Sequence, residues 1–256
     1  MSAVTPRASE RVRVRAVDPQ TAAFLRDTED LVRSHRAVEH PFLNAYRVQG
    51  APADAERLIY SECYYYFRHL PFYIPGIVLK TRDEGILREV LLTVLDEVMD
   101  EPTHSGLYLD FMQRIGLDRA ALEAYRPLPT TTAMDEGTRR LYVDDPLLIA
   151  LGALFADETM SGIMVSKLDQ GLSASGRDEE TRYFWILHVT AEAGHSNSVY
   201  NAIAPLLADE GARREFRVGV ERFLGLLEQY WDGIAALVSQ SASVAQAVSI
   251  SGPGPS

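Results

Sequence analysis

The sequence predicts an all-α protein with one folded domain, and three observations support this prediction. Apolar residues recur at helical spacing over most of the chain. No alternating run of apolar and polar residues is long enough to predict a strand. The 256 residues include 46% hydrophobic side chains, which is enough to bury the core of one sizeable domain.

Segments with helical periodicity alternate with turn-forming stretches. The predicted helices cover residues 19–38, 53–70, 72–81, 84–114, 118–125, 145–171, 178–205 and 208–239. Stretches rich in Gly, Pro, Asp, Ser or Thr separate several of them, at 49–54, 125–132 and 171–178. We expect the folded domain over 18–240, between a disordered N-terminal arm (1–17) and a disordered tail (241–256), because both ends bury little apolar surface.

Charge and cysteine content exclude several classes of function. Asp and Glu number 36 against 25 Lys and Arg, and this net charge of -11 opposes binding to nucleic acid. Cys63 is the only cysteine, so no internal disulfide forms, which fits a cytoplasmic protein. The N-terminus lacks an apolar signal segment, and no continuous run of about 18 apolar residues predicts a membrane span. These features argue against nucleic acid as a partner and indicate neither secretion nor a membrane.

The segment HVTAEAGHSN places three metal-binding side chains on one side of the predicted helix 178–205. His188, Glu192 and His195 follow one another at spacings of four and three residues, and Phe184 shares their face. A Glu carboxylate on an apolar stripe costs several kcal/mol to desolvate unless a cation compensates it. A divalent metal ion supplies that charge.

Two further helices carry residues of the same types. In the predicted helix 84–114, Glu97, Glu101 and His104 repeat the spacings of four and three. In the predicted helix 145–171, Glu158 lies on an apolar face, and we expect Asp157 to point elsewhere. Imidazole and carboxylate without thiolate form the typical ligand set of iron or manganese, with zinc as an alternative. The number of such residues indicates two metal ions.

One interpretation of these residues is a ferritin-like diiron site. Such sites use two E-x-x-H motifs and one further Glu from each of two other helices. Glu101 with His104 and Glu192 with His195 supply the two motifs. Glu158 and Glu62 supply the single carboxylates, but Glu97 and His188 then have no role.

The second interpretation rests on a family resemblance. The order E-x6-H (Glu97, His104), a lone Glu (Glu158) and H-x3-E-x2-H resembles the haem-oxygenase-like diiron oxidases and oxygenases, which share a seven-helix fold with thiaminase II and pyrroloquinoline-quinone synthase. The segments HPFLNAY at 40–46, YYYFRHLPFY at 64–73 and SKLDQGL at 166–172 add to the likeness, which covers roughly 25–235. The family usually has Asp where this chain has Glu192, which puts the coordination by that carboxylate in doubt.

This resemblance implies a haem-oxygenase-like bundle of about seven core helices and a complete set of metal ligands. The implied ligands are Glu97, His104, Glu158, His188, Glu192 and His195, with Glu62 and Glu101 as an extra ligand or as hydrogen-bond partners of ligands. The implied cofactors are two Fe(II) ions, with O2 as co-substrate. We expect the substrate pocket to be lined by Tyr65, Tyr66, Arg68, His69 and Tyr73.

The resemblance further implies a non-haem diiron oxygenase that oxidises a small amine or amino-acid-like substrate in natural-product biosynthesis. We favour N-oxygenation, and the alternatives are oxidative C–C cleavage and fatty-acid decarboxylation on the same site. An external electron donor is implied, and a homodimer is expected by analogy with the fold. Lys167 is expected on the opposite side of its helix from Glu158, without a catalytic role.

Two other classes of protein compete with this interpretation. The first is a metal-free enzyme of the thiaminase II or quinone-synthase type. The complete ligand set argues against it, and Cys63 does not occupy the position of the thiaminase nucleophile. The second is a non-catalytic bundle that stores or senses metal.

Overall fold

The computed structural model describes residues 17–189, 200 and 203–250, and all the regular structure in them is helical. The first half contains α1 (Pro19–Ser34), α2 (Pro41–Gln49), α3 (Ala53–Phe67), α4 (Leu70–Tyr73), α5 (Pro75–Val78), α6 (Glu84–Val98), α7 (His104–Arg114) and α8 (Arg119–Ala124). The second half contains α9 (Pro129–Arg139), the π-helical η2 (Arg140–Asp144), α10 (Leu147–Ala174), a helical segment over 183–189, the short η3 (Ala204–Leu206) and α12 (Glu210–Ile250). The predicted all-α class is confirmed.

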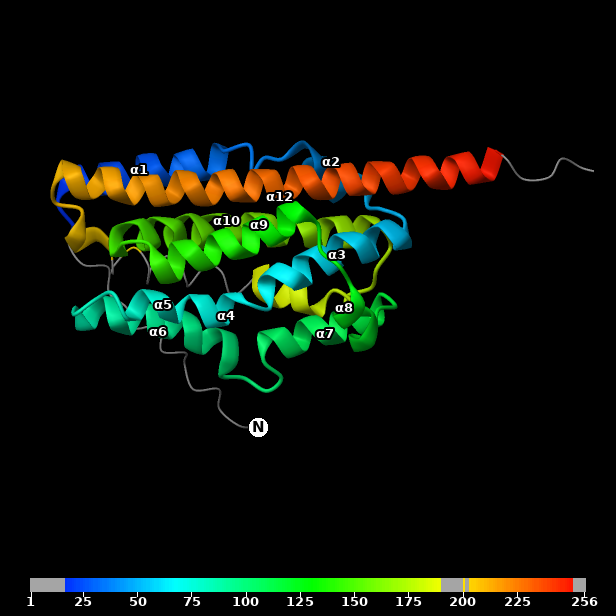
Figure 1. Cartoon of the computed structure of the whole chain (residues 1–256), viewed down its shortest axis with the longest axis horizontal. Coiled ribbons are helices and arrows are strands. Elements are labelled where there is room, and N and C mark those ends of the chain that lie inside the picture. The colour runs from blue at the N-terminus through cyan, green and yellow to red at the C-terminus, as the bar shows by residue number, and fades with distance from the viewer. Residues whose placement is uncertain (1–16, 190–199, 201–202, 251–256) are drawn as a thin grey trace, which may run out of the picture.

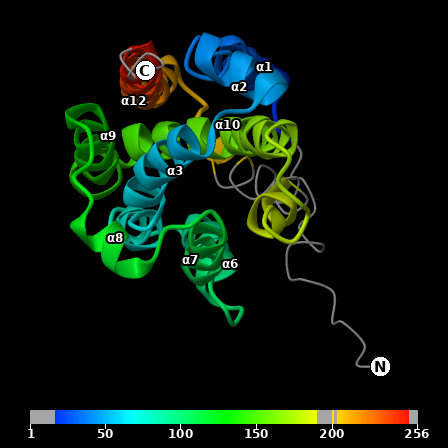
Figure 2. The same ribbon diagram turned by 90° about the vertical axis from the view of Figure 1, so that its right-hand side faces the viewer.

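Helix α10 lies at the centre of the molecule. It packs against α12 and α2, and α12 also packs against α9 and α3. Figures 1 and 2 show α1, α2 and α12 on one side of α10, and α6 and α7 on the opposite side. By length and mean hydropathy (1.5) α10 resembles a membrane span, but 61% of its apolar window is buried inside the protein. This is the pattern of a core helix.

Two glycines allow the backbones of α10 and α12 to approach closely. A Cβ atom on Gly152 would lie 2.0 Å from the carbonyl oxygen of Phe216 on α12. A Cβ atom on Gly219 would lie 2.0 Å from the carbonyl oxygen of Ile149 on α10. Only a residue without a side chain fits at these positions, so the two glycines set the distance between the central helices.

Several helix boundaries differ from the sequence predictions. The predicted helix 84–114 is two helices, α6 and α7, and the predicted helix 72–81 corresponds to two short ones, α4 and α5. Helices α2 and α9 were not predicted; both begin with a proline at the first helical position, where its missing N–H costs nothing. Helix α12 continues to Ile250, into the tail that we expected to be disordered, because no Gly or Pro interrupts 241–250.

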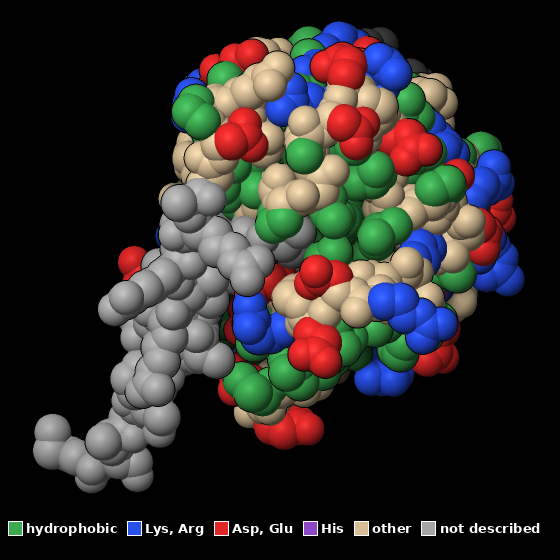
Figure 3. All heavy atoms as spheres, turned by 90° about the vertical axis from the view of Figure 1, so that its left-hand side faces the viewer, with side chains coloured by type: hydrophobic (Ala, Val, Ile, Leu, Met, Phe, Trp, Pro, Cys, Tyr) green, Lys and Arg blue, Asp and Glu red, His purple; other side chains and the backbone are tan. Residues whose placement is uncertain are grey.

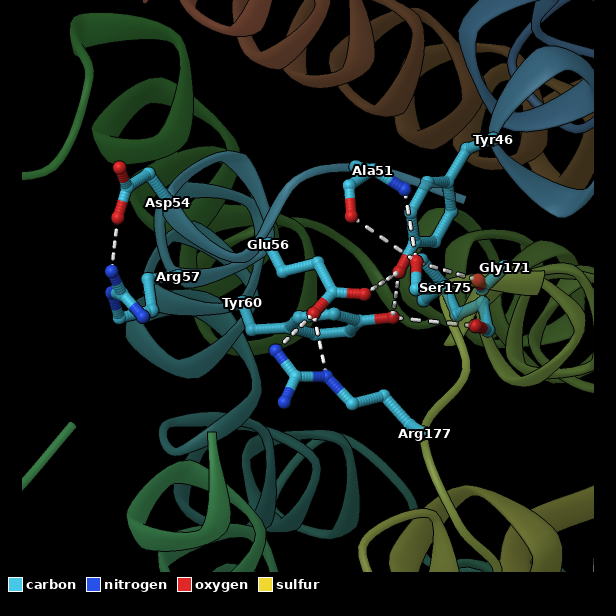
Figure 4. A network of polar contacts seen from close by, with 10 residues as sticks. Tyr46, Ala51, Asp54, Glu56, Arg57, Tyr60, Gly171, Ser175 and Arg177 are labelled. Carbon is cyan, nitrogen blue, oxygen red and sulfur yellow. Dashed lines mark hydrogen bonds and ion pairs between the residues drawn. The ribbon is translucent and has the colours of Figure 1, made fainter. Parts of the chain in front are cut away.

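A buried polar network fixes the C-terminal end of α10 to α2 and α3 (Figure 4). The guanidinium group of Arg177 donates two hydrogen bonds, of 2.9 and 2.7 Å, to the fully buried carboxylate of Glu56 on α3. The hydroxyl groups of Tyr46 and Tyr60 lie 3.0 Å apart, and Tyr60 donates to the carbonyl oxygen of Leu168 on α10. These contacts hold α3, and with it the residues that follow, in place against the core.

The surface is charged on the face shown in Figure 3. Acidic and basic side chains are interspersed there, with apolar side chains between them. Both signs of charge are expected on the surface of a chain with 36 acidic and 25 basic side chains.

Candidate metal centre

A cavity of about 100 Å³ lies between α3, α6, α7, α10 and the helical segment 183–189. Four of the six expected metal ligands line it, from separate parts of the chain: Glu97, His104, Glu158 and His188. The remaining wall is largely apolar and includes Phe67, Leu70, Met160, Met164, Val165 and Trp185. The fold therefore collects carboxylate and imidazole groups in one cavity whose remaining wall is largely apolar.

Glu97 and His104 come from two helices, so the prediction that one helix carries both was wrong. Helix α6 ends at Val98 and α7 begins at His104, because Pro102 disfavours helical backbone at the residue before it. Thr103 caps α7 by accepting a hydrogen bond of 3.2 Å from the backbone N–H of Gly106. The two side chains still meet, with Oε2 of Glu97 3.2 Å from Nδ1 of His104.

The ring of His188 is oriented by the backbone of its own helix. Its Nδ1 atom lies 2.7 Å from the carbonyl oxygen of Phe184. Because a carbonyl oxygen only accepts, Nδ1 donates this hydrogen bond, and Nε2 of the same ring lies 3.2 Å from Nδ1 of His104. Metal-binding histidines almost always donate their second ring N–H to such an acceptor. His188 is thus held in the orientation of a ligand that binds through Nε2.

The spacing of these donor atoms fits a shared ion. Two nitrogen ligands about 2.1 Å from one metal and about 90° apart are separated by about 3 Å. The two contacts at Nδ1 of His104, to Glu97 and to His188, are both 3.2 Å. The two contacts share one atom, Nδ1 of His104. Within the described residues, no group of three His, Cys, Asp or Glu side chains is arranged to hold an ion by itself. Further ligands would be needed to complete a site.

The other two expected ligands, Glu192 and His195, lie outside the described residues. Of the additional candidates, Glu62 is fully buried away from the cavity wall, where its carboxylate accepts hydrogen bonds from the hydroxyl of Tyr125 and from the backbone N–H of Leu128. Glu101 is exposed in the turn between α6 and α7. Neither residue lines the cavity.

Asp157 also lines the cavity, although the sequence predicted that it points elsewhere. It is buried beside Glu158, and its Oδ2 accepts a hydrogen bond of 2.7 Å from the hydroxyl of Tyr142. Burial, followed by the negative charge of Asp157, raises the pKa of Tyr142 well above its ordinary value, so the hydroxyl remains a donor. The cavity thus contains one more carboxylate than the periodicity of α10 indicated.

The expected pocket residues divide into two groups. Arg68 lines the cavity, together with Tyr64, which the sequence analysis had not selected. The other four expected residues do not line it. Tyr66 is buried in the core, and Tyr65 packs against the ring of His69. His69 and Tyr73 both form hydrogen bonds to Asp135 on α9, at 2.8 and 3.2 Å. The tyrosine-rich segment therefore contributes one face to the cavity and another to the packing of α9.

Two other reactive side chains are engaged elsewhere. The thiol of Cys63 accepts a hydrogen bond of 3.3 Å from Tyr230, and burial raises its pKa to about 12. The ammonium group of Lys167 bonds to the carbonyl oxygen of Val38 at 2.7 Å and to Glu39 at 2.8 Å. Neither residue lines the cavity, which agrees with the expectation that Lys167 has no catalytic role.

Comparisons with known proteins agree with this ligand chemistry. A family model described as iron-containing redox enzyme matches residues 57–228. The 4-chloro-allylglycine synthase of Streptantibioticus cattleyicolor is 53% identical over 228 residues, which are 89% of each chain. The 4-aminobenzoate synthase of Nitrosomonas europaea is 26% identical over 84% of this chain and 92% of its own length.

Solved structures agree with the fold. A CADD-like protein of unknown function from Nostoc punctiforme superposes with a TM-score of 0.73 at 16% identity, over 86% of this chain and 98% of its own. A domain of unknown function with a heme oxygenase-like fold from Shewanella denitrificans gives a TM-score of 0.68 at 17% identity, over 88% and 94%. The predicted haem-oxygenase-like fold is confirmed.

Proposed function

The chain belongs to the family of iron-containing redox enzymes, and from this premise we propose that it is a non-haem diiron oxygenase that oxidises a small amino-acid-like substrate with O2. The observation that carries the proposal is the line of contacts from Glu97 through His104 to His188 inside the cavity. Imidazole and carboxylate groups, without a thiolate, suit iron.

In this proposal the metal ions are held by side chains of several helices. Glu97, His104, Glu158 and His188 line the cavity, and Glu192 and His195 would complete the set from the residues beyond 189. Two ferrous ions would supply electrons for the reduction of dioxygen. The hydrogen bond from His188 to the carbonyl oxygen of Phe184 keeps Nε2 available for a metal ion.

The lining of the cavity bears on the class of substrate. Arg68 and Asp157 bring charge into its wall beside apolar residues such as Met160 and Trp185. A wall with charged groups suits a small polar metabolite better than a long acyl chain. We therefore disfavour fatty-acid decarboxylation.

The names of the two curated relatives guide the choice of reaction. Each synthase is named for a product that carries both an amino and a carboxyl group. An allyl group contains a terminal C=C bond, and forming that bond in a saturated side chain removes two electrons without adding oxygen to nitrogen. We therefore propose oxidative C–C cleavage in place of the N-oxygenation that the sequence favoured. The bond beyond the new C=C breaks, the terminal carbon leaves with its amino group as an imine, and two electrons and two protons pass to O2 to give hydrogen peroxide. Tyr65, His69 and Tyr73, which we expected to line the substrate pocket, lie away from the cavity wall.

Anaerobic reconstitution with Fe(II), followed by exposure to oxygen, tests the proposal. We expect about two iron ions per chain and an oxygen uptake that one or more small amino acids accelerate. Mass spectrometry of the products distinguishes the two reactions. C–C cleavage with alkene formation shortens the side chain, whereas N-oxygenation keeps its length and adds one oxygen atom. Zinc-loaded protein is the control. A folded sample that binds no iron, or whose oxygen uptake is independent of iron, would contradict the proposal.

A further inference from the structure

Arg68 brings a positive charge into the cavity that holds the metal-binding side chains. It follows α3 directly, as the residue that ends this helix, and its side chain lines the cavity. The Nε atom is buried and has no hydrogen-bond partner in the described part of the chain. The carboxylates of Glu97, Asp157 and Glu158 line the same cavity; Glu97 contacts His104, and Asp157 accepts a hydrogen bond from Tyr142.

Two tyrosine rings hold the guanidinium group. Its central carbon lies 4.6 Å from the ring centroid of Tyr65 and 5.4 Å from that of Tyr64. Such cation–π contacts fix the plane of the group but satisfy none of its N–H donors. The two rings therefore hold the guanidinium group in place, while its Nε donor has no acceptor among the described residues.

A buried N–H group without an acceptor is unfavourable, and a guanidinium group stays charged at all working pH values. In a binding cavity this cost is recovered when an anionic ligand accepts the free hydrogen bonds. The planar fork of the guanidinium group matches a carboxylate in particular, with two parallel N–H donors. A carboxylate held in this way is also kept from binding the iron itself.

We propose that Arg68 binds the carboxylate of the amino-acid substrate and so directs the rest of the molecule toward Glu97, His104 and His188. This inference rests on the proposed function for the class of substrate. It assigns to Arg68 a specificity role: amino acids bind, and the corresponding amines or amides do not.

Binding of two matched probes, measured without turnover, tests the inference. L-allylglycine retains the amino-acid part of the product for which the 53% identical relative is named, and its primary amide lacks only the negative charge. Titration calorimetry in the absence of oxygen gives both affinities, for the iron-free and the Fe(II)-loaded protein. The variants are Arg68→Gln and Arg68→Lys. The control is Arg57→Gln, which removes an arginine of α3 that pairs with the exposed Asp54.

We expect the wild-type protein and Arg57→Gln to bind the acid at least about 30-fold more tightly than the amide, which corresponds to about 2 kcal/mol. Arg68→Gln should bind both probes with similar affinity. Arg68→Lys should retain part of the preference, because lysine keeps the charge but not the fork.

A preference for the acid that survives in Arg68→Gln would overturn the inference, as would a wild-type protein that binds neither probe. If Arg68→Gln does not fold, an undiminished preference in Arg68→Lys overturns it. Iron content and oxygen uptake are measured on the same samples. If these fail while the iron-free protein still discriminates through Arg68, the proposed function is wrong and the inference stands.

Discussion

Nε2 of His188 lies 3.2 Å from Nδ1 of His104, although 84 residues separate the two histidines in sequence. Their ring centroids are 4.4 Å apart, and the ring of Phe184 packs against His188 at 4.1 Å. The contact places two ring nitrogens from different helices side by side at the cavity wall. Metal ions bind imidazole through an unprotonated ring nitrogen.

Replacement of His188 by alanine should therefore abolish much of the iron binding. We expect the variant to lose at least about one iron ion per chain and its oxygen uptake to fall about 100-fold, as for loss of a ligand or its partner. Metal analysis and an oxygen electrode measure both quantities. His69→Ala is the control, because His69 bonds to Asp135 away from the cavity. Unchanged values in His188→Ala would favour the ferritin-like interpretation, in which His188 has no role.

Glu97 and Glu101 provide a second, matched pair of variants. The Glu97 carboxylate lies inside the cavity, 3.2 Å from His104, whereas Glu101 is exposed in the following turn. Glu97→Gln should lower iron content, because a neutral amide is a weak ligand for iron. Glu101→Gln should bind iron like the wild-type protein. The reverse result would show that Glu101 and His104 act as a ferritin-type E-x-x-H pair.

The sequence allowed the fold class and four of the residues that line this cavity, Glu97, His104, Glu158 and His188, to be predicted, but not the local geometry that brings them together. Spacings of four and three placed Glu97 and His104 on one side of a single helix, yet the chain breaks at Pro102 and Thr103 starts a new helix. The two side chains meet across the turn. Glu97 and His104 are neighbours as predicted, but a turn between two helices brings them together, and not one continuous helix.

Other differences have the same origin, since periodicity describes one helix at a time. Neither Pro41 nor Pro129 lies in a predicted helix, but each is the first residue of a helix. Asp157 was expected to point elsewhere than Glu158, but the central helix α10 is buried on more than one face, and Asp157 is buried too. Contacts from other helices, such as the hydroxyl of Tyr142, decide which side chains reach the cavity.

The close contact of α10 with α12 predicts opposite effects for two glycines of α12. Alanine at Gly219 would place Cβ 2.0 Å from the backbone of α10, so the helices must separate, at a cost of about 3 kcal/mol. Alanine at Gly225 meets no atom within 4 Å and should stabilise the helix by about 0.5–1 kcal/mol. Urea unfolding of the metal-free proteins measures both. Equal effects at the two positions would contradict the observed packing.

The ion pair of Arg177 with Glu56 should contribute strongly to stability. Arg177→Met leaves a fully buried carboxylate without its cation, and we expect a loss of about 3 kcal/mol in the free energy of unfolding. Adding Glu56→Gln should restore part of this loss, because the neutral amide is cheaper to bury. Arg33→Met is the control, since its ion pair with Glu29 is exposed and worth less than about 0.5 kcal/mol. If Arg177→Met is no less stable than the control, the network in Figure 4 does not stabilise the fold.

The buried thiol of Cys63 predicts a pH effect of known sign. Burial raises the pKa of Cys63 from 9.0 to about 12, so between these values the unfolded chain has released a proton that the folded protein retains. Stability must therefore fall as the pH rises through this range, by at most about 1.4 kcal/mol per pH unit from this group. Buried tyrosines contribute with the same sign, so the difference in slope between the wild-type protein and Cys63→Ala isolates the thiol.

At pH 8 a thiol reagent should label Cys63 at least about 1000-fold more slowly in the folded protein than in urea, because only the thiolate reacts. Rapid labelling of the folded protein, or identical slopes in the two proteins, would mean that the thiol is accessible to solvent and available for chemistry.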